Sequence, residues 1–230
     1  MGGVRWLTGF LDAQDRSAED FWCAVTGSSL SARRGGGRFA TLVPADGDAY
    51  LRVQVTSSPG PASCHLDLHG SPVVPPGGRL VLAEGDLSVY RSPAGLPFCV
   101  VPASERFVRP GPVGGALVDQ MCLDVPEALF EREAEFWASL TGFTRRPSDL
   151  PEFEVLERGE GLALRVLMQR TGGPAAGMHL DFAAEDVAAT VARHVGLGAS
   201  VVRRVPGQWT TLRDPAGREY CVTARSPGLS

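Results

Sequence analysis

The sequence predicts an α+β protein made of two related units, and three observations support this prediction. Short sequence landmarks recur in the same order in both halves of the 230 residues. Runs with strand periodicity and runs with helical periodicity follow one another as strand, helix, strands. A segment rich in proline and glycine separates the two halves. We therefore expect tandem βαβββ modules, four in all.

The recurring landmarks are too many and too well ordered to arise by chance. The two copies of the last landmark are separated by more residues than the two copies of the others. The halves therefore differ in length between their HLD and PAG landmarks. The pairs are Phe21-Trp22 with Phe136-Trp137, Thr26-Gly27 with Thr141-Gly142, Leu51-Arg52-Val53 with Leu164-Arg165-Val166, His65-Leu66-Asp67 with His179-Leu180-Asp181, and SPAGLPFCV from Ser92 with DPAGREYCV from Asp214.

The segment PASERFVRPGPVGG between the halves has the composition of a linker. We place a first unit at residues 1–103, a linker at 104–115 and a second unit at 116–230. Two units of roughly one hundred residues each are within the usual size of small domains.

In the second unit, Leu129, Phe136 and Leu140 form one apolar helical stripe that Gly142 ends. A second helix has Val187, Val191 and Val195 on one face and His194 on its exposed or flanking side. The strands are predicted from alternation and from the Asp214–Gly217 turn. The predicted elements are strand 115–125, helix 126–142, strands 152–156 and 162–170, strand 177–184, helix 184–198 and the hairpin 209–212 with 219–224.

The first unit follows the same order, with an opening helix at residues 17–26. Its second helix is missing, because the corresponding segment HGSPVVPPGGRL has prolines and glycines that cannot sustain helical hydrogen bonds. The first unit is therefore a degenerate copy.

Composition excludes several classes of protein. The net charge is −4 and the 22 basic residues, all arginine, form no basic stripe, so nucleic acid is not an expected partner. No run is long and apolar enough to span a membrane, and the start has no cleavage signature. The five cysteines are an odd number and lie far apart in the sequence without a CxxC pair, which suggests neither a disulfide framework nor a zinc ribbon. We expect a soluble protein of the reducing cytoplasm.

The order of elements and the motifs resemble the vicinal oxygen chelate superfamily, which includes glyoxalase I, extradiol dioxygenases and bleomycin-resistance proteins. The motifs are Phe-Trp before Thr-Gly, His-Leu-Asp opening the second module, and the final Asp-Pro-Ala-Gly turn, a variant of the family's Asp-Pro-x-Gly-Asn. The glyoxalase-like branch is the most similar. The resemblance implies curled mixed sheets with helices on the convex face and a ligand cavity on the concave face. Four modules in one chain would imitate a dimer, so a monomeric pseudo-dimer and a homodimer both stay open.

Strand alternation decides which side chains face that cavity. His65 and Asp67 lie on one side of their strand and Leu66 on the other. Because helices bury apolar surface against a sheet, we expect the leucines under the helices and the polar side chains in the cavity. His179 and Asp181 follow the same alternation.

The resemblance also implies metal-ligand positions, one on each of four strands, usually His or Gln, Glu, His and Glu. The third position has His65 or His179, the second has Gln54 or Gln169, and the last has Cys99 or Cys221. The first position is matched only through a gap, by Leu7 or a neighbour in the first unit and by Asp119 in the second. This set lacks the hard carboxylates of glyoxalase or dioxygenase metals, so we expect no bound metal.

Structural interpretations compete with these functional ones. A histidine on a half-buried strand is more often a hydrogen-bonded structural residue, and buried cysteines are more often small hydrophobes than nucleophiles. In a catalytic alternative, His179 acts as a general base that Asp181 or Gln169 orients.

We predict a metal-independent small-molecule-binding protein whose cavity lies mainly in the second unit. The overall acidic charge favours cationic ligands. One alternative is a metal-dependent lyase or isomerase of the glyoxalase I type acting on a 2-oxo substrate, and another is a structural module with filled cavities. The predicted ligand-binding residues are His179, Asp181, Gln169, Cys221, His65, Asp67, Gln54 and Cys99.

Overall fold

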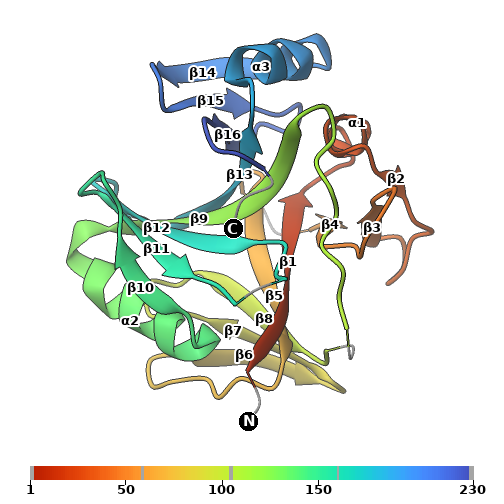
Figure 1. The fold of residues 1–230 in the computed structure, drawn as a ribbon. Coiled ribbons are helices and arrows are strands. Elements are labelled where there is room, and N and C mark those ends of the chain that lie inside the picture. The colour runs from red at the N-terminus through yellow and green to blue at the C-terminus, as the bar shows by residue number, and fades with distance from the viewer. Residues whose placement is uncertain (1–2, 58–59, 104–105, 160, 228–230) are drawn as a thin grey trace.

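The computed structural model describes residues 3–57, 60–103, 106–159 and 161–227, which form two eight-stranded mixed sheets and three α-helices (Figure 1). The first sheet has the strand order β2-β3-β4-β1-β5-β8-β7-β6. The elements of the first half are β1 (Val4–Ala13), α1 (Glu19–Thr26), β2 (Ser29–Leu30), β3 (Phe39–Val43), β4 (Leu51–Val55), β5 (Ser63–Gly70), β6 (Arg79–Glu84), β7 (Leu87–Arg91) and β8 (Pro97–Val101).

The second sheet repeats this order as β10-β11-β12-β9-β13-β16-β15-β14. Its short strands β10 and β14 are absent from the elements that the sequence predicts. The elements of the second half are β9 (Ala116–Pro126), the 3₁₀ turn η1 (Glu127–Leu129), α2 (Phe130–Thr141), β10 (Thr144–Pro147), β11 (Phe153–Glu157), β12 (Arg165–Thr171), β13 (Gly177–Ala184), α3 (Val187–Gly196), β14 (Ser200–Val205), β15 (Trp209–Arg213) and β16 (Glu219–Thr223).

The identical strand orders confirm the α+β fold class and the tandem βαβββ modules. In each sheet two modules meet along an antiparallel pair, β1 with β5 and β9 with β13. Residues 71–78 form no helix, so α3 has no counterpart in the first half. In the sequence, the strands of the first sheet precede the predicted linker and those of the second sheet follow it. Residues 104 and 105 of the linker are outside the described ranges. Independent domains at the predicted boundaries stay a prediction.

The aliphatic faces of the two sheets pack against one another. Leu66 and Leu180 are fully buried in one continuous core that draws residues from both sheets. The sheets approach closely at Gly9, where a Cβ atom would lie 3.3 Å from Leu180 Cδ2. A side chain at Gly9 would therefore require Leu180 and its neighbours to shift by a few tenths of an ångström.

Each opening helix packs against the half to which it does not belong. Trp22 of α1 stacks on Phe182 of β13, with ring centroids 6.1 Å apart, and its Nε1 donates to Asp214 Oδ2 at 2.8 Å. Trp137 of α2 lies 5.3 Å from the ring of Phe98 on β8. These contacts explain why the Phe-Trp landmark occurs twice: each tryptophan fills the core between the sheets.

Asp214, which accepts the hydrogen bond from Trp22, also stabilises the glycine-containing turn that follows it. Asp214 Oδ1 accepts hydrogen bonds from the backbone amides of Ala216 and Arg218, each at 2.9 Å. Arg218 donates 2.7 Å bonds to Asp214 Oδ2 and to the carbonyl oxygen of Asp12 in the first half. In the other half, Glu133 links Trp137 to the equivalent turn, because its carboxylate accepts from Trp137 Nε1 and from the amide of Ala94, both at 2.7 Å. The two halves are thus joined reciprocally.

Helix α3 differs from its predicted orientation. Its buried residues are Thr190, Val191 and His194, whereas Val195 is 43% exposed. His194 faces the core because Tyr220 Oη lies 2.9 Å from its Nδ1 and supplies a polar partner. Burial lowers the pKa of His194 to about 4, so it is neutral at pH 7. None of the helices in the described ranges has the length and apolar character of a membrane span.

Candidate functional site

A cavity of about 800 Å³ occupies the face of the second sheet opposite the core. Alternate residues of β9, β12, β13 and β16 line it, because successive side chains of a strand point to opposite faces. Of the predicted residues, it brings together His179, Asp181, Gln169 and Cys221. Leu180 and Phe182 face the core instead, as the alternation predicts.

His179 lies between two carboxylates. Its Nδ1 donates to Asp124 Oδ2 at 2.9 Å, and its Nε2 is 3.2 Å from Asp181 Oδ1. Burial lowers the pKa of His179, but the facing carboxylates of Asp181 and Asp124 outweigh burial and raise the pKa above its ordinary value. An imidazolium at this position offsets the charge of the two carboxylates.

Asp124 was not among the predicted site residues, and Asp119, which the gapped match placed at the first ligand position, lies away from His179. A bulge opposite Asp181 and Phe182 interrupts the register of β9 beside Asp119, and Asp119 pairs with Arg225, whose Nη2 is 2.7 Å from Oδ1. In the first half, where the match was to Leu7 or a neighbour, Leu7 itself is fully buried in the core.

Two thiols flank His179. Cys122, which the sequence reasoning also missed, lies beside His179 in the register of β9 with β13 and donates to Gln169 Oε1 at 3.8 Å. Cys221 Sγ is 3.9 Å from His179 Nε2. Burial raises the pKa of Cys122 to about 12, so it is a neutral thiol at pH 7.

A polar chain leads from Asp181 to a cationic side chain. Gln120 Nε2 donates to Asp181, and Gln120 Oε1 accepts from Arg165 Nε at 2.6 Å. Burial lowers the pKa of Arg165, and the neighbouring Arg225 acts in the same direction. The guanidinium nevertheless stays charged at neutral pH, because arginine is protonated far above pH 7.

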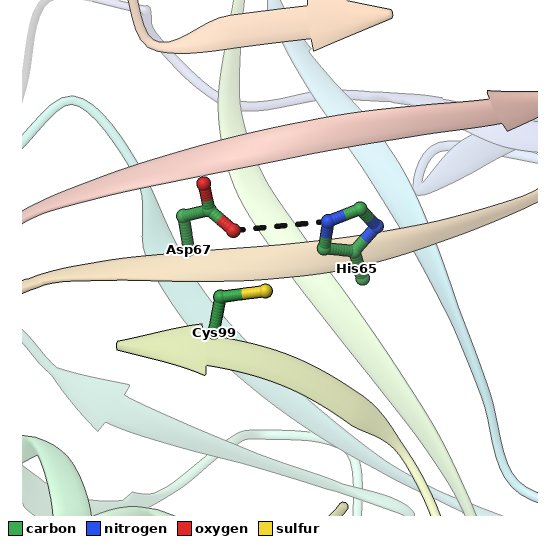
Figure 2. A group of neighbouring side chains, drawn as sticks. All are labelled: His65, Asp67 and Cys99. Atoms are coloured by element: carbon green, nitrogen blue, oxygen red, sulfur yellow. Dashed lines mark ion pairs between the residues drawn. The ribbon is translucent and has the colours of Figure 1, made fainter. Parts of the chain in front are cut away.

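The first sheet has a smaller version of the same arrangement (Figure 2). His65 Nδ1 donates to Asp12 Oδ2 at 2.6 Å, and Nε2 lies 3.7 Å from Asp67 Oδ1. Cys99 of β8 lies opposite Asp67 in the register of the sheet, and its side chain is directed toward this pair in Figure 2. Burial lowers the pKa of His65, but Asp12 and Asp67 outweigh this effect and raise it.

Gln54 does not join this group. It is beside Asp12 in the register of β1 with β4, as Gln169 is beside Asp124 in β9 with β12. Its side chain lines a separate small recess next to Trp22. Gln54 and Gln169 therefore occupy equivalent positions in the two sheets. Of the two, only Gln169 lines the large cavity.

Aromatic and cationic side chains fill the first-sheet counterpart of the cavity. Phe10 stacks on His65 with ring centroids 4.4 Å apart, and the Phe39 ring meets Phe10 edge-on at 6.5 Å. Arg52 covers the other side of Phe10 at 5.6 Å and lies 3.6 Å from Asp67. In register, Phe10 occupies in β1 the place that Cys122 has in β9.

Two groups of side chains have the composition of metal ligands: His65 with Asp67 and Cys99, and Cys122 with His179 and Asp181. Within each group the donor atoms lie within 4.8 Å of one another. Each group has only one carboxylate, which already faces a histidine, and a thiol. This does not fit the oxygen-rich octahedral site of manganese or magnesium. Nitrogen and sulfur donors would suit a softer ion such as zinc better.

Comparisons with known proteins agree with this architecture. The glyoxalase-like domain family matches residues 10–101 and 120–223. A comparison with curated protein sequences finds no match.

Solved structures with the same fold include a glyoxalase, a dioxygenase and a synthase. The Mn(II)-bound glyoxalase from Novosphingobium aromaticivorans has a TM-score of 0.66 and 16% identity, covering 97% of this chain and 83% of that chain. A variant of homoprotocatechuate 2,3-dioxygenase from B. fuscum has a TM-score of 0.64 and 14% identity, covering 97% and 72%. A mutant of 4-hydroxymandelate synthase from Streptomyces coelicolor has a TM-score of 0.61 and 14% identity, covering 100% and 95%. At these identities the likeness shows the fold alone.

Proposed function

The chain belongs to the glyoxalase-like domain family, and on that premise we propose that it binds a small molecule in the second-sheet cavity without a divalent metal ion. The predicted membership of the vicinal oxygen chelate superfamily is confirmed. The observation that carries the proposal is the contrast between the cavity of about 800 Å³ around His179 and the filled space around His65. The lining of the cavity combines apolar side chains such as Leu167 with polar ones that converge near His179, and such a combination can hold and orient a small molecule.

The electrostatics of His179 favour binding over base catalysis. A general base must be unprotonated at the working pH, whereas the raised pKa of His179 keeps its imidazole protonated at neutral pH. Asp124, rather than Asp181 or Gln169, holds Nδ1. His179 is thus suited to hold Asp124 and Asp181 at the floor of the cavity as a cation, with Nε2 facing Asp181 at 3.2 Å.

The donor set supports the proposal as far as a hard divalent ion such as manganese or magnesium is concerned. At the last ligand position, where the resemblance implies a glutamate, this chain has the thiol of Cys221. The carboxylate of Asp181 already accepts a hydrogen bond from Gln120. A hard divalent ion would therefore gain little from this site.

Ligand screening by thermal shift in the presence of a chelator tests the proposal. A ligand that binds only native protein raises the midpoint of unfolding. We expect binders whose effect is lost in His179→Ala and Gln169→Ala and kept in His65→Ala. A binder whose effect survives both second-sheet substitutions would show that the site lies elsewhere.

A metal-dependent lyase or isomerase acting on a 2-oxo substrate is the second candidate. The observation that favours it is the cluster of Cys122, His179 and Asp181 in the cavity. Elemental analysis of protein purified without chelator separates the two candidates. Stoichiometric metal that is lost in Cys122→Ser would replace the metal-independent proposal with this one.

We further propose a cytoplasmic protein that does not bind nucleic acid and that acts as a monomeric pseudo-dimer. All five cysteines are free thiols and the net charge is −4, which supports the first two statements. The reciprocal contacts of Trp22 and Trp137 support the third, because each half covers the other. Light scattering after size exclusion measures the oligomeric state, and a dimer mass would leave the homodimer alternative in its place.

A further inference from the structure

We propose that the second-sheet cavity selects a small organic anion, whose carboxylate binds the guanidinium of Arg165. This inference rests on the proposed function, because it names the ligand class for the same cavity. It reverses the expectation from the overall acidic charge, since the wall of the cavity differs in sign from the chain as a whole.

Arg165 lies in a cluster of arginines at the wall of the cavity. Four arginines, at positions 109, 158, 165 and 225, are close enough to influence one another or to share the carboxylate of Asp119. Arg225 binds Asp119 directly, and Arg158 Nη1 donates to the carbonyl oxygen of Asp119 at 3.3 Å. Burial lowers the pKa of Arg158 to about 10, and Arg109, Arg165 and Arg225 add to this effect.

Only two of these arginines, Arg165 and Arg225, line the cavity. Arg225 is committed, since its Nε donates to Thr223 Oγ1 at 2.9 Å and its terminal nitrogens bind Asp119. Arg165 uses Nε for Gln120. Within the described ranges, its two terminal nitrogens have no hydrogen-bond partner in the protein. A partly desolvated cation with two unused donors is a receptor for an anion.

The orientation of Arg165 is prepared in advance. Gln120 holds its Nε at 2.6 Å, and Asp181 in turn holds Gln120. A planar guanidinium fixed in this way presents a fork of parallel donors, which matches the two oxygens of a carboxylate. The carboxylates around His179 do not repel such a ligand strongly, because the imidazolium lies between Asp124 and Asp181.

The rest of the cavity suits an apolar or aromatic body. Phe153 and Trp209 line it and meet edge-to-face with ring centroids 5.8 Å apart. Leu167 and Val155 add aliphatic surface. The cavity could thus hold a carboxylate at Arg165 and a ring near Trp209.

Matched pairs of probes that differ in charge test this inference. Benzoate and phenylacetate are titrated beside benzamide and phenylacetamide, with inorganic phosphate and benzamidine as further arms. Tryptophan fluorescence reports binding, because Trp209 lines the cavity and the other three tryptophans are at most 1% exposed. We expect a carboxylate to bind at least about tenfold more tightly than its amide, as one charge-assisted hydrogen bond provides.

Variants then locate the anion. Arg165→Gln should weaken the carboxylate about tenfold or more, and Arg165→Lys should weaken it less, because lysine keeps the charge and loses the fork. Arg52→Gln in the first sheet is the matched control and should change nothing. Circular dichroism checks that each variant is folded.

The outcomes separate this inference from the proposed function. Amides or benzamidine that bind as well as the carboxylates, in a manner that depends on His179, would overturn the choice of an anion and leave the cavity as a binding site. Binding of phosphate alone, or a carboxylate affinity unchanged in Arg165→Gln, would also overturn it. If no probe binds and the wider ligand screen finds no binder, both the inference and the proposed function are wrong.

Discussion

The two sheets have the same histidine between the same two acids, yet only one of them surrounds a cavity. Asp12, His65 and Asp67 repeat as Asp124, His179 and Asp181. The difference comes from the neighbouring strand, where Phe10 stacks on His65 and the smaller Cys122 stands beside His179. The HLD motif therefore builds the floor of a site, and the residues opposite it decide whether that floor is accessible.

The comparison also separates what each half contributes to stability. Trp22 and Trp137 reach the opposite half, so the core is shared even though the cavity is not. The two halves thus share the residues that join them, whereas the open cavity is found only in the second. Four substitution or titration experiments would break or sharpen this comparison.

The largest effect is expected from the shared core. Trp22→Ala should lower the free energy of unfolding by about 4 kcal/mol, because it empties a fully buried site and leaves Asp214 without the indole donor. Chemical denaturation followed by circular dichroism measures this loss. We expect a single transition for both halves, and two separate transitions would show that the halves fold independently.

Removing the ring that fills the first sheet should have the next largest effect. Phe10→Ala should cost about 3 kcal/mol, because Phe10 is 5% exposed and packs on His65. The mirror-image substitution Cys122→Phe should fill the second cavity and abolish ligand binding. A Cys122→Phe protein that is folded and still binds with full affinity would show that this wall does not shape the site.

Acid should destabilise the half that has kept its second helix. The folded pKa of His194 is about 4, below its ordinary value, so the unfolded chain binds more protons between these values and stability falls as pH falls. We expect a loss of roughly 2 kcal/mol at pH 5 relative to pH 8 from this group. His194→Gln is the control, and an identical pH profile for both proteins would contradict the assignment.

The histidines at the two sites should titrate alike, which is the smallest effect but compares the sheets directly. The pKa values of His65 and His179 are raised, so their imidazolium forms stabilise the fold at low pH, and this stabilisation is lost as pH rises through the folded values. Burial lowers the pKa of His69. Proton NMR should find two histidines titrating above 6.5 and two below it. A His179 resonance that titrates below this value would restore the general-base alternative.

Much of the fold could be predicted because the sequence contains an internal repeat, so that each half can be aligned with the other. The landmarks Phe-Trp, HLD and PAG lie in core or turn contacts that recur in both halves. Strands β10 and β14 were missed because their residues are mostly exposed and arginine-rich, with no alternation. The helix face of α3 was misjudged because a buried histidine with a tyrosine partner does not look apolar in sequence.

The site was only partly predictable because the first strand of each unit was aligned through a gap. A repeated pair, Leu11-Asp12 and Leu123-Asp124, would have located the acids on His65 and His179. Arg52 and Arg165, which the sequence repeat aligns, do not occupy equivalent positions in the two sheets. Arg52 lies beside Phe10, whereas Arg165 lies beside Gln120. Which cavity is filled depends on how Phe10 packs across strands, and that information is absent from the motif itself.

Histidine-resolved NMR during a benzoate titration tests most directly whether the second sheet alone receives the ligand. The chain has four histidines, so their resonances can be assigned by single substitutions. We expect the His179 resonances to shift with saturation while those of His65 stay in place. A shift at His65 that matches or exceeds the shift at His179 would contradict the assignment of the binding site to the second sheet.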